Sequence, residues 1–321
     1  LYIISGETGF KKTDEKILDS IGTVRKMDYQ SNFNLFIFNT FLNVIWCQTI
    51  IIWFASIHAI PVIILNYIFN RRLIIIAGGF DVANEPKSSY GSMRGKSRTV
   101  LGKWILSRAH RVIAVSKSNK KEILFNANVN PDKVELIYNA ILFNGKKVNS
   151  NKKKQILTVG EINKETFLRK GLDRFIQIAT KMPDYQFYHI GKWTNNKGRL
   201  TDEMFKYVES ISPPNIKYLG YVNTEVLRQY YLESKVYLQL SRHEAFGISV
   251  VEAMSYNCTP IVTNSYALPE IVGRNGFIVQ NIDEAILKIK TVLESELFSI
   301  DHSLLSEFLI ENRRDKFNQL I

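Results

Sequence analysis

The sequence has few of the features that mark disulfide-bonded, metal-binding or disordered proteins. Its 321 residues include only two cysteines, Cys47 and Cys258, which lie far apart and fit neither a disulfide framework nor a metal cluster. This scarcity favours a reducing compartment. Eight prolines, 17 glycines and the lack of low-complexity tracts or solenoid repeats exclude a disordered or repeat protein. A globular chain of this length is expected to form two domains.

Charge is absent from one long stretch, because no Asp, Glu, Lys or Arg occurs in Tyr29–Asn70. Within it, residues 50–69 have the length of a membrane-spanning helix, but Pro61 interrupts them and their β-branched start is typical of a buried strand. We expect a strand followed by a helix over about Ser56–Phe69. This helix is apolar nearly all round, so it lies in the core or against lipid. The core is favoured, because parallel sheets bury their elements.

Negative charge is scarce in the first half of the chain. Residues 1–148 hold 20 Lys and Arg against 10 Asp and Glu, whereas residues 149–321 hold 22 against 20. Most of the excess falls in the segment Arg71–Lys121, which has 12 basic and two acidic residues. Such a surface favours an anionic partner, either an acceptor or a membrane. An anion- or nucleic-acid-binding protein is a further interpretation, but no nucleic-acid motif is present, so no nucleic acid is expected as a partner.

Strand and helix patterns alternate along the whole chain. The strand patterns YIIS, TIIIWFA and LIIIAGG are separated by helical patterns, and a second alternation starts with KQILTVG. This order predicts an α/β protein with two doubly wound parallel sheets. The polar, basic segment Asn144–Lys154 is the best linker candidate. We therefore divide the chain into domains 1–148 and 149–321. The chain starts directly in a strand pattern at Leu1, so a truncated amino terminus is an open alternative.

The most informative stretch is SRHEAFGISVVEAM. Glu244 and Glu252 stand eight positions apart, with Phe246 and Gly247 between them, and a helix is expected from about Ile248. A helix start directs free N–H groups and a positive dipole end at an anion such as a diphosphate. Glycine allows close backbone approach, and the two carboxylates can accept hydrogen bonds from sugar and ribose hydroxyls. Because the helix is mostly apolar, Glu252 needs a partner for its charge.

The run E-A-F-G-I-S-V-V-E-A-M, followed by P-I-V-T and L-P-E-I-V, resembles the signature of retaining glycosyltransferases of family 4, the glycosyl transferases group 1. The resemblance covers roughly the last two thirds of the chain and includes VGEINKETFLRKGLDRFIQIA, YHIGKW, IKYLGYV, RVIAVSKSNKKEI and VELIYNAI. It implies the GT-B fold, in which two Rossmann-like domains face a central cleft. The closing segment IENRRDKFNQLI resembles the family's last helix, which often crosses back to the first domain.

The resemblance implies an enzyme that moves a hexose or N-acetylhexosamine from a nucleotide diphosphate sugar to a glycan, a lipid-linked or another anionic acceptor. UDP or GDP is the expected nucleotide, transfer is retaining, and no metal or further cofactor is implied. The expected location is cytoplasmic. Membrane association is a separate hypothesis, because a basic, partly apolar surface can lie on the anionic inner face of a membrane without spanning it.

The family's motifs also imply roles for single residues. In the family the lysine of the R-K-G motif binds the diphosphate, and here Lys170 follows Arg169. By resemblance, Glu244 holds the donor sugar and Glu252 the ribose. Ligands of such sheets lie beyond the carboxyl ends of the strands. The remaining donor-binding positions are Gly160, Gly191, Gly220, Tyr221, Val222, Phe246, Gly247 and Ile248.

Two departures from the family's pattern motivate an alternative function. Many members have an arginine directly after the glycine that follows the first strand of the second domain, where this chain has Glu161 after Gly160. Many also have a histidine near the glycine turn of the first domain, where Phe80 or Asp81 stands. His58 is a candidate substitute, although a lone histidine beside an apolar segment is more often a core residue. The catalytic candidates are Glu244, Lys170 and Asp81, and the acceptor-side candidates are Gly78, Gly79, Phe80 and His58. The alternative function is a non-catalytic nucleotide-sugar-binding partner subunit.

Overall fold

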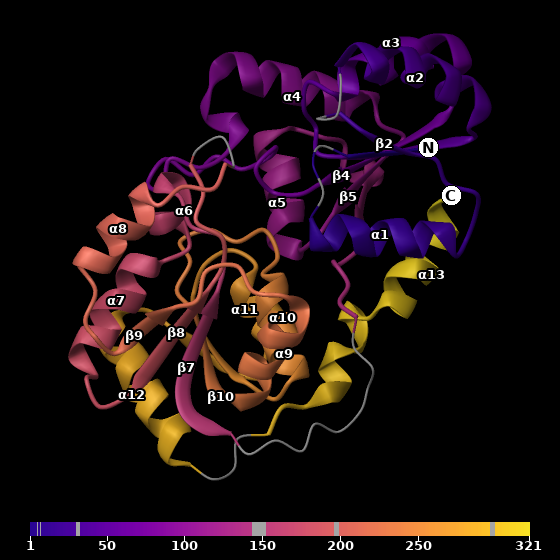
Figure 1. Ribbon diagram of the computed structural model, residues 1–321. Coiled ribbons are helices and arrows are strands. Elements are labelled where there is room, and N and C mark those ends of the chain that lie inside the picture. Colours follow the sequence, from indigo (N-terminus) through magenta and orange to yellow (C-terminus); the bar gives the residue numbers. More distant parts are fainter. Residues whose placement is uncertain (5, 7, 30–32, 143–151, 196–198, 296–298) are drawn as a thin grey trace. The chain divides into compact units, whose positions relative to one another are not determined.

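The computed structural model describes residues 1–321 except 5, 7, 30–32, 143–151, 196–198 and 296–298 (Figure 1). The chain divides into two compact units, the first made of Leu1–Leu142 and Ser306–Ile321 and the second of Phe143–Leu305. The predicted boundary at 148 and most of the predicted linker lie outside the described residues.

The first unit is built on a six-stranded sheet in the order β2-β1-β3-β4-β5-β6, in which every adjacent pair is parallel. Its strands are β1 (Tyr2–Ile4), β2 (Lys26–Asp28), β3 (Thr49–Trp53), β4 (Arg72–Ala77), β5 (Arg111–Ala114) and β6 (Val134–Leu136). Its α-helices are α1 (Gly9–Asp19), α2 (Phe33–Trp46), α3 (Ala59–Phe69), α4 (Lys96–Arg108), α5 (Lys117–Asn126) and α13 (Ile310–Leu320).

The second unit has a six-stranded parallel sheet in the order β12-β11-β10-β7-β8-β9. Its strands are β7 (Lys153–Val159), β8 (Gln186–Ile190), β9 (Ile216–Tyr218), β10 (Ser234–Gln239), β11 (Thr259–Thr263) and β12 (Phe277–Val279). Its α-helices are α6 (Lys164–Arg169), α7 (Leu172–Lys181), α8 (Glu203–Ser210), α9 (Thr224–Glu233), α10 (Ile248–Ser255), α11 (Leu268–Val272) and α12 (Ile282–Glu294).

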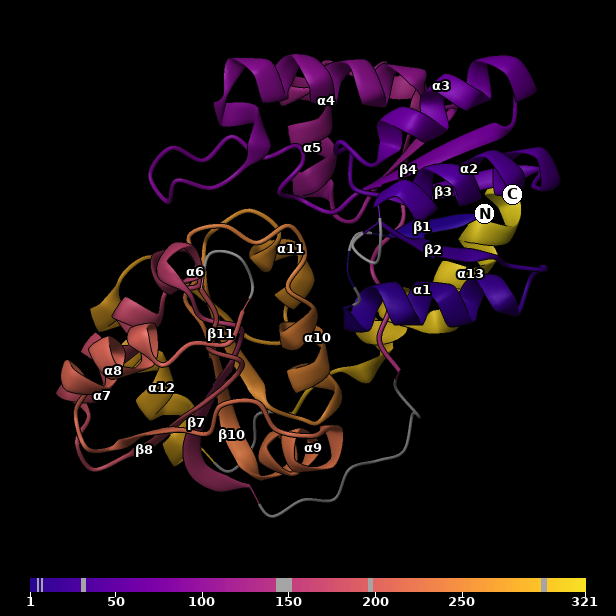
Figure 2. The same cartoon turned by 45° about the horizontal axis from the view of Figure 1, so that its top comes forward.

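Helices cover both faces of the second sheet. Helices α7, α8 and α12 lie on one side of it and α9, α10 and α11 on the other (Figures 1 and 2). Strands covered on both faces are expected to read as continuous apolar runs, and the central strand β10 is buried over almost its whole length. In the first unit, β3 and β4 are buried in the same way. The two parallel sheets confirm the α/β fold class predicted from the alternating pattern.

The prediction that α3 lies in the core is wrong for one face of this helix. Ala59, Val62 and Ile63 are buried, whereas Ile64 and Ile68 are 55% and 75% exposed. The physical reason is that α3 packs on the sheet side and against α2, and no described element covers its outer side. Among the residues that the structure describes, no helix has the length and apolar character needed to cross a membrane.

A buried ion pair ties the last helix to the first unit. Arg313 of α13 is 1% exposed and donates from Nε and Nη2 to the carboxylate of Asp14 in α1, at 2.6 and 2.7 Å. Its Nη1 donates to the carbonyl oxygens of Ile137 and Tyr138. Trp53 Nε1 donates to Asp14 Oδ2 at 3.0 Å. Each guanidinium nitrogen and both carboxylate oxygens therefore have partners, as a buried pair requires.

Truncation of this pair on one side is expected to destabilise the protein strongly. Arg313→Ala leaves the Asp14 carboxylate buried without its cation, so the free energy of unfolding should fall by about 3–5 kcal/mol in urea denaturation. Arg314→Ala is the matched control, because the Arg314 side chain is 42% exposed, and its effect should stay within about 0.5 kcal/mol. A loss below about 1 kcal/mol for Arg313→Ala would show that the pair does not anchor α13.

Candidate functional site

The predicted glycine turns lie side by side at the carboxyl ends of β7, β8 and β9. The N–H of Gly160 donates to the carbonyl oxygen of Ile190, and that of Gly191 to the carbonyl oxygen of Gly220, both at 2.9 Å. A Cβ on Gly191 would lie 1.9 Å from the Gly160 oxygen, so no side chain fits there. The structure thus brings these three positions together at one edge of the second sheet.

Lys170 and Glu244 form an ion pair at the same edge. Lys170 Nζ lies 2.6 Å from Glu244 Oε1, and the two side chains are 23% and 9% exposed. The same oxygen accepts hydrogen bonds from Ser241 Oγ at 3.1 Å and from Gln239 Nε2 at 3.3 Å. Burial by itself would raise the pKa of Glu244, but the nearby Lys170 and Arg169 outweigh it and the pKa is lowered. Glu244 is therefore a carboxylate at neutral pH.

Lys170 is positioned by a short helix that the sequence analysis missed. Helix α6 starts with a reciprocal cap, in which Asn163 accepts from the backbone of Thr166 and Thr166 returns a bond. This pattern is a known helix-start signal and could have revealed α6. After Lys170, Gly171 has a φ of 74°, and a Cβ there would lie 2.1 Å from the Leu240 oxygen. Only glycine lets α6 turn so closely past the end of β10.

The predicted helix start follows Glu244 directly. Gly247 caps α10 with a φ of 94°, in the left-handed region. Phe246 is 3% exposed and anchors the turn in the core, and Ile248 is the first helical residue. The first turn of a helix carries N–H groups without intrahelical acceptors, so this turn is suited to an anion.

Glu252 has the partner that its burial requires. Tyr231 of α9 donates from its hydroxyl group to Glu252 Oε2 at 3.0 Å. The Tyr231 ring is itself buried and stacks on Tyr256, with the ring planes 7° apart. Burial raises the pKa of Glu252 to about 6, and the bond from Tyr231 offsets only part of this rise. Additional donors, such as ribose hydroxyls, would favour the ionised form.

Glu161 holds a neighbouring segment in place. Its Oε1 accepts a hydrogen bond from Thr194 Oγ1 at 2.6 Å. Of the two cations that could replace the family's arginine, Arg169 is near enough to contribute to the lowered pKa of Glu244, whereas Lys164 pairs loosely with an acidic residue of α8. Arg169 is thus the better candidate for the second cation of the site.

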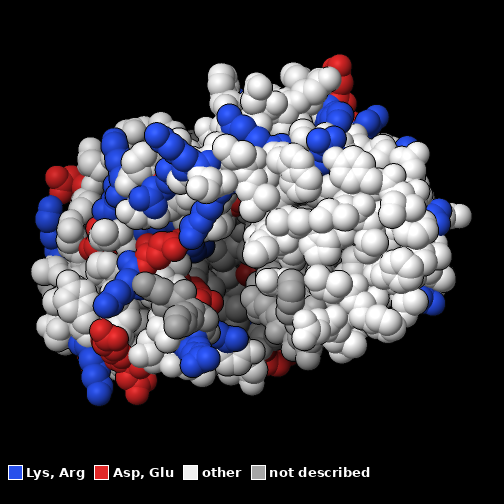
Figure 3. Space-filling view, turned by 90° about the horizontal axis from the view of Figure 1, so that it is seen from above, with Lys and Arg blue, Asp and Glu red and all other residues white. Residues whose placement is uncertain are grey.

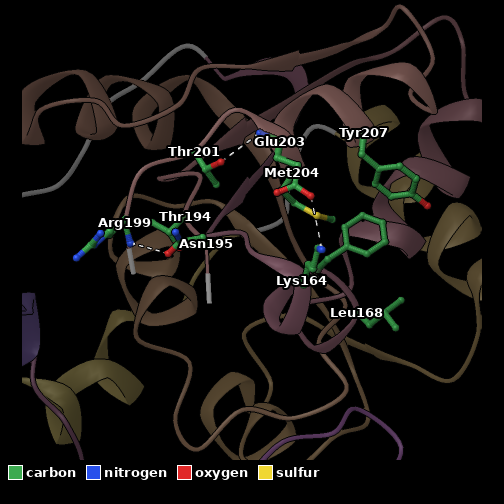
Figure 4. Close-up of a pocket in the computed structure, with 10 residues that line it drawn as sticks. Lys164, Leu168, Thr194, Asn195, Arg199, Thr201, Glu203, Met204 and Tyr207 are labelled. Atoms are coloured by element: carbon green, nitrogen blue, oxygen red, sulfur yellow. Dashed lines mark hydrogen bonds and ion pairs between the residues drawn. The ribbon is translucent and has the colours of Figure 1, made fainter. Parts of the chain in front are cut away.

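A separate cavity of about 850 Å³ lies between α6, α8 and the segment that precedes α8 (Figure 4). Lys164 and Arg199 contribute basic groups to its wall, and in Figure 4 the ammonium group of Lys164 reaches Glu203, at 3.6 Å. Its lining includes neither Lys170 nor Glu244. No sequence pattern marks this cavity, because it forms between elements that are distant in the sequence.

The edge beyond β9 presents an exposed aromatic ring. Tyr221 is 71% exposed, and the Lys192 ammonium group lies 4.8 Å from its ring centre. Val222, which follows, is half-buried. His189, which the sequence analysis did not single out, is buried, and burial lowers its pKa to about 4. Its neutral ring donates from Nε2 to the Gly160 oxygen at 3.0 Å and so supports the first glycine turn.

In the first unit, Asp81 and His58 are bound to the backbone. The two carboxylate oxygens of Asp81 accept from the N–H groups of Gly79 and Ala55, at 3.0 and 2.9 Å, and burial raises its pKa to about 6. His58 is 2% exposed, bonds to the carbonyl oxygen of Trp53 at 2.9 Å, and has a pKa that burial lowers to about 4. The structure supports the core interpretation of His58, and Asp81 joins the turns after β3 and β4.

The rest of the acceptor-side set lies in the turn after β4. A Cβ on Gly78 would lie 2.0 Å from the ring of Phe54, which explains the glycine. Phe80 is 40% exposed and contacts Tyr90 edge-on, with ring centres 5.4 Å apart. Phe80 is therefore the acceptor-side candidate whose side chain reaches solvent.

Two parallel six-stranded α/β units define a protein of the GT-B class, and solved structures agree. HepE of Anabaena, in complex with UDP and glucose, matches 99% of this chain and 98% of its own with a TM-score of 0.79 at 14% identity. The lipopolysaccharide outer core galactosyltransferase WaaB matches the same shares with a TM-score of 0.70 at 14% identity. The chain belongs to the family Glycosyl transferases group 1, whose sequence profile matches residues 142–314. The predicted family and GT-B fold are confirmed.

The sequence relatives described next each match between half and two thirds of the chain. An uncharacterized 41.2 kDa protein in the cps region of Klebsiella pneumoniae is 29% identical over 204 residues, 60% of this chain and 53% of that protein. The phosphatidylinositol N-acetylglucosaminyltransferase GPI3 subunit of Saccharomyces cerevisiae is 28% identical over 182 residues, 52% of this chain and 38% of that protein. The chain thus spans about half or less of the length of these curated relatives.

The raised pKa of Glu252 predicts a pH-dependent cost of its charge. The pKa of Glu252 in the folded state, about 6, lies above the ordinary value of 4.5 for a glutamate. The neutral carboxyl group therefore favours the folded state fully below about pH 4.5, and this contribution to the free energy of unfolding is lost as the pH rises through about 6. Glu252→Gln keeps an acceptor for Tyr231 and cannot ionise. At about pH 7.5 it should raise the free energy of unfolding by about 2 kcal/mol.

Urea denaturation between about pH 4.5 and pH 8 measures this gain, which should shrink toward the acid end. Glu294→Gln, at an exposed position of α12, is the control and should show no comparable trend. A gain for Glu252→Gln that stays the same at both ends of the range would contradict the assigned shift.

Proposed function

We propose that this chain is a retaining glycosyltransferase that moves a hexose or N-acetylhexosamine from a nucleotide diphosphate sugar to an acceptor hydroxyl. The observation that carries the proposal is the 2.6 Å pair of Lys170 and Glu244 beside the first turn of α10. It combines a cation for a diphosphate, backbone N–H groups for phosphate oxygens and a carboxylate for sugar hydroxyls. Membership in the family supports the same activity.

The diphosphate would bind between two sources of positive charge. Lys170 and Arg169 come from the end of α6, and the N–H groups of Gly247 and Ile248 come from the start of α10. These groups would neutralise the diphosphate without a metal ion. Because the Lys170 side chain is 23% exposed, it can keep its contact with Glu244 and still reach a phosphate oxygen.

The sugar and the ribose would each meet a carboxylate. Glu244 is held ionised by its basic neighbours, so it can accept hydrogen bonds from donor-sugar hydroxyls. Glu252 lies about one turn into α10, and ribose hydroxyls would add to the single bond from Tyr231. The base would lie toward the edge formed by Gly220 and Tyr221, where the exposed ring offers a flat apolar face.

The transfer would proceed on one face of the sugar. The bond between the anomeric carbon and the β-phosphate oxygen breaks while the acceptor hydroxyl oxygen forms the new bond from the same side. The acceptor's proton passes to the departing β-phosphate oxygen, so no separate protein base is required. Negative charge grows on the diphosphate as the sugar becomes oxocarbenium-like, and Lys170, Arg169 and the α10 first turn would stabilise it. Such prearranged electrostatic stabilisation is commonly the largest catalytic contribution.

UDP is the first nucleotide to test, with GDP next. HepE is known in complexes with UDP and with UDP-glucose, and TarM in a complex with UDP. For the acceptor, the names of relatives point to lipid and glycan classes: one is an alpha-galactosylglucosyldiacylglycerol synthase of Streptococcus pneumoniae and another an O-antigen chain mannosyltransferase of Escherichia coli. We propose a glycan or lipid-linked acceptor that approaches the Gly78–Phe80 turn.

A non-catalytic nucleotide-sugar-binding partner subunit is the second candidate. Three observations favour it: Glu161 occupies the position of a common arginine, His58 is buried, and both oxygens of Asp81 are bound to the backbone. Turnover of any donor, including slow hydrolysis, would exclude this candidate.

A thermal-shift panel tests the donor. UDP, GDP, ADP, CMP and TDP, each with matching sugar conjugates, should include one base that stabilises the protein clearly more than the others. A ligand at about 100 times its dissociation constant adds about 2.7 kcal/mol of stability. No stabilisation by any nucleotide, with or without a glycan or lipid acceptor present, would contradict the proposed donor site.

Variants of the three charged residues should separate binding from transfer. Glu252→Ala should weaken nucleotide binding by about 1–3 kcal/mol, because the ribose loses its acceptor. Glu244→Ala should mainly slow transfer, and Lys170→Ala should reduce both. Calorimetric titration and donor turnover provide the two measurements. Lys164→Ala is the matched control for Lys170→Ala and should leave both near wild type. Unchanged nucleotide binding in Glu252→Ala would refute the ribose assignment.

A further inference from the structure

One face of the first unit is apolar although it is exposed. Figure 3 looks down on the side that carries α2, α3 and α4, and shows a broad area without charged residues. The exposed large apolar residues of α2, of α3 and of the turn before α3 have exposed fractions of 41–75%. They are Leu35, Ile37, Phe38, Phe41, Leu42, Ile45, Trp46, Ile57, Ile64, Tyr67 and Ile68. We call this surface the α2–α3 face.

The α2–α3 face is not the usual outer side of a surface helix. The inward row of α2, with Phe36, Thr40 and Val44, is buried on the sheet, and a polar row is expected opposite it. Here the opposite row is apolar as well. One aromatic side chain has an area of about 150–250 Å², and the face includes four of them, each about half exposed, together with seven aliphatic side chains. The exposed apolar area therefore exceeds the few hundred Å² that is common on a soluble monomer.

Basic side chains border the α2–α3 face. The Arg25 guanidinium lies 4.1 Å from the ring centre of Trp46, and that of Arg108 lies 5.4 Å from the ring centre of Tyr67. Arg71 donates to carbonyl oxygens at the end of α2. Helix α4, which packs beside α3, adds the exposed residues Lys96, Arg98 and Lys103. The face thus combines an apolar centre, aromatic residues and a cationic border.

We propose that the α2–α3 face docks on the surface of an anionic lipid bilayer, with both helices lying in the plane of the interface. Apolar and aromatic side chains would enter the boundary between headgroups and acyl chains, and the bordering cations would contact lipid phosphates. The helices are 14 and 11 residues long, which suits lying on a membrane and not crossing it.

A second copy of the chain fits this face less well. A two-fold symmetric dimer places the same surface on both sides of the interface, so the cationic border of one copy would meet that of the other. Like charges brought together in this way oppose association. An anionic bilayer has the complementary charge. All residues of the face belong to the first unit, so the proposal does not depend on the proposed donor site in the second.

Sedimentation of the full chain with lipid vesicles tests the proposal. At low salt the protein should pellet with vesicles of phosphatidylcholine containing about 30% phosphatidylglycerol, and much less with phosphatidylcholine alone. The double variant Phe38→Glu and Ile68→Glu should lower the partition coefficient by about tenfold or more. Leu287→Glu is the matched control, because Leu287 is 61% exposed on α12 of the second unit, and should bind like wild type. The thermal shift with a nucleotide should be the same in all three proteins.

A second measurement avoids any folding defect of the double variant. Trp46 is 41% exposed on the α2–α3 face, whereas Trp53 and Trp193 are buried. The fourth tryptophan, Trp104 of α4, is half-buried, and the Arg108 guanidinium lies near both its ring and that of Tyr67, so the comparison is made in a Trp104→Phe background. Brominated lipids should quench the fluorescence of this background protein, and the addition of Trp46→Phe should remove most of the quenching.

Three results would overturn the proposal: no pelleting of wild type with anionic vesicles, equal pelleting of the double variant, or no quenching. A wild-type dimer in analytical ultracentrifugation that the double variant dissociates, without vesicle binding, would assign the face to self-association instead.

Discussion

The close approach of turns at the carboxyl edge of the second sheet is the constraint on which the rest of the site depends. Gly191 passes the Gly160 oxygen, and Gly171 passes the end of β10, at distances that leave no room for a Cβ. Because Gly171 turns there, the end of α6 lies against β10 and its Lys170 reaches Glu244. The close backbone contacts of these glycines thus bring the charged pair, the helix start and the glycine turns to one edge of the sheet.

The two glutamates that flank the start of α10 have pKa values that are shifted in opposite directions. Glu244 lies beside Lys170 and Arg169, and their charges outweigh the effect of burial on its pKa. Glu252 is partly buried and has one neutral donor, Tyr231, so desolvation is only partly offset and raises its pKa to about 6. The first is a permanent carboxylate suited to hold a cation and a sugar. The second gains most from a ligand that brings hydroxyl groups.

The first unit distributes polarity in an unusual way. Its interior contains the Arg313–Asp14 pair with every charged atom bound, while its outer α2–α3 face has no charge at all. Because a buried ion pair forms only in a narrow range of geometries, this pair can determine where helix α13 packs on the first unit. The exposed part of this face is apolar, which agrees with a surface that meets another apolar phase.

The sequence by itself determined the alternation of strands and helices, because periodicity and local propensity decide it. The helix expected from about Ile248 begins at that residue in the structure, and the family resemblance implied roles for Glu244 and Glu252. Only the tertiary structure decided which partners these residues have. Tyr231 for Glu252, the backbone amides for Asp81 and the open side of α3 all depend on contacts between distant segments. Neither pattern nor spacing specifies such contacts, since they arise when separate elements pack.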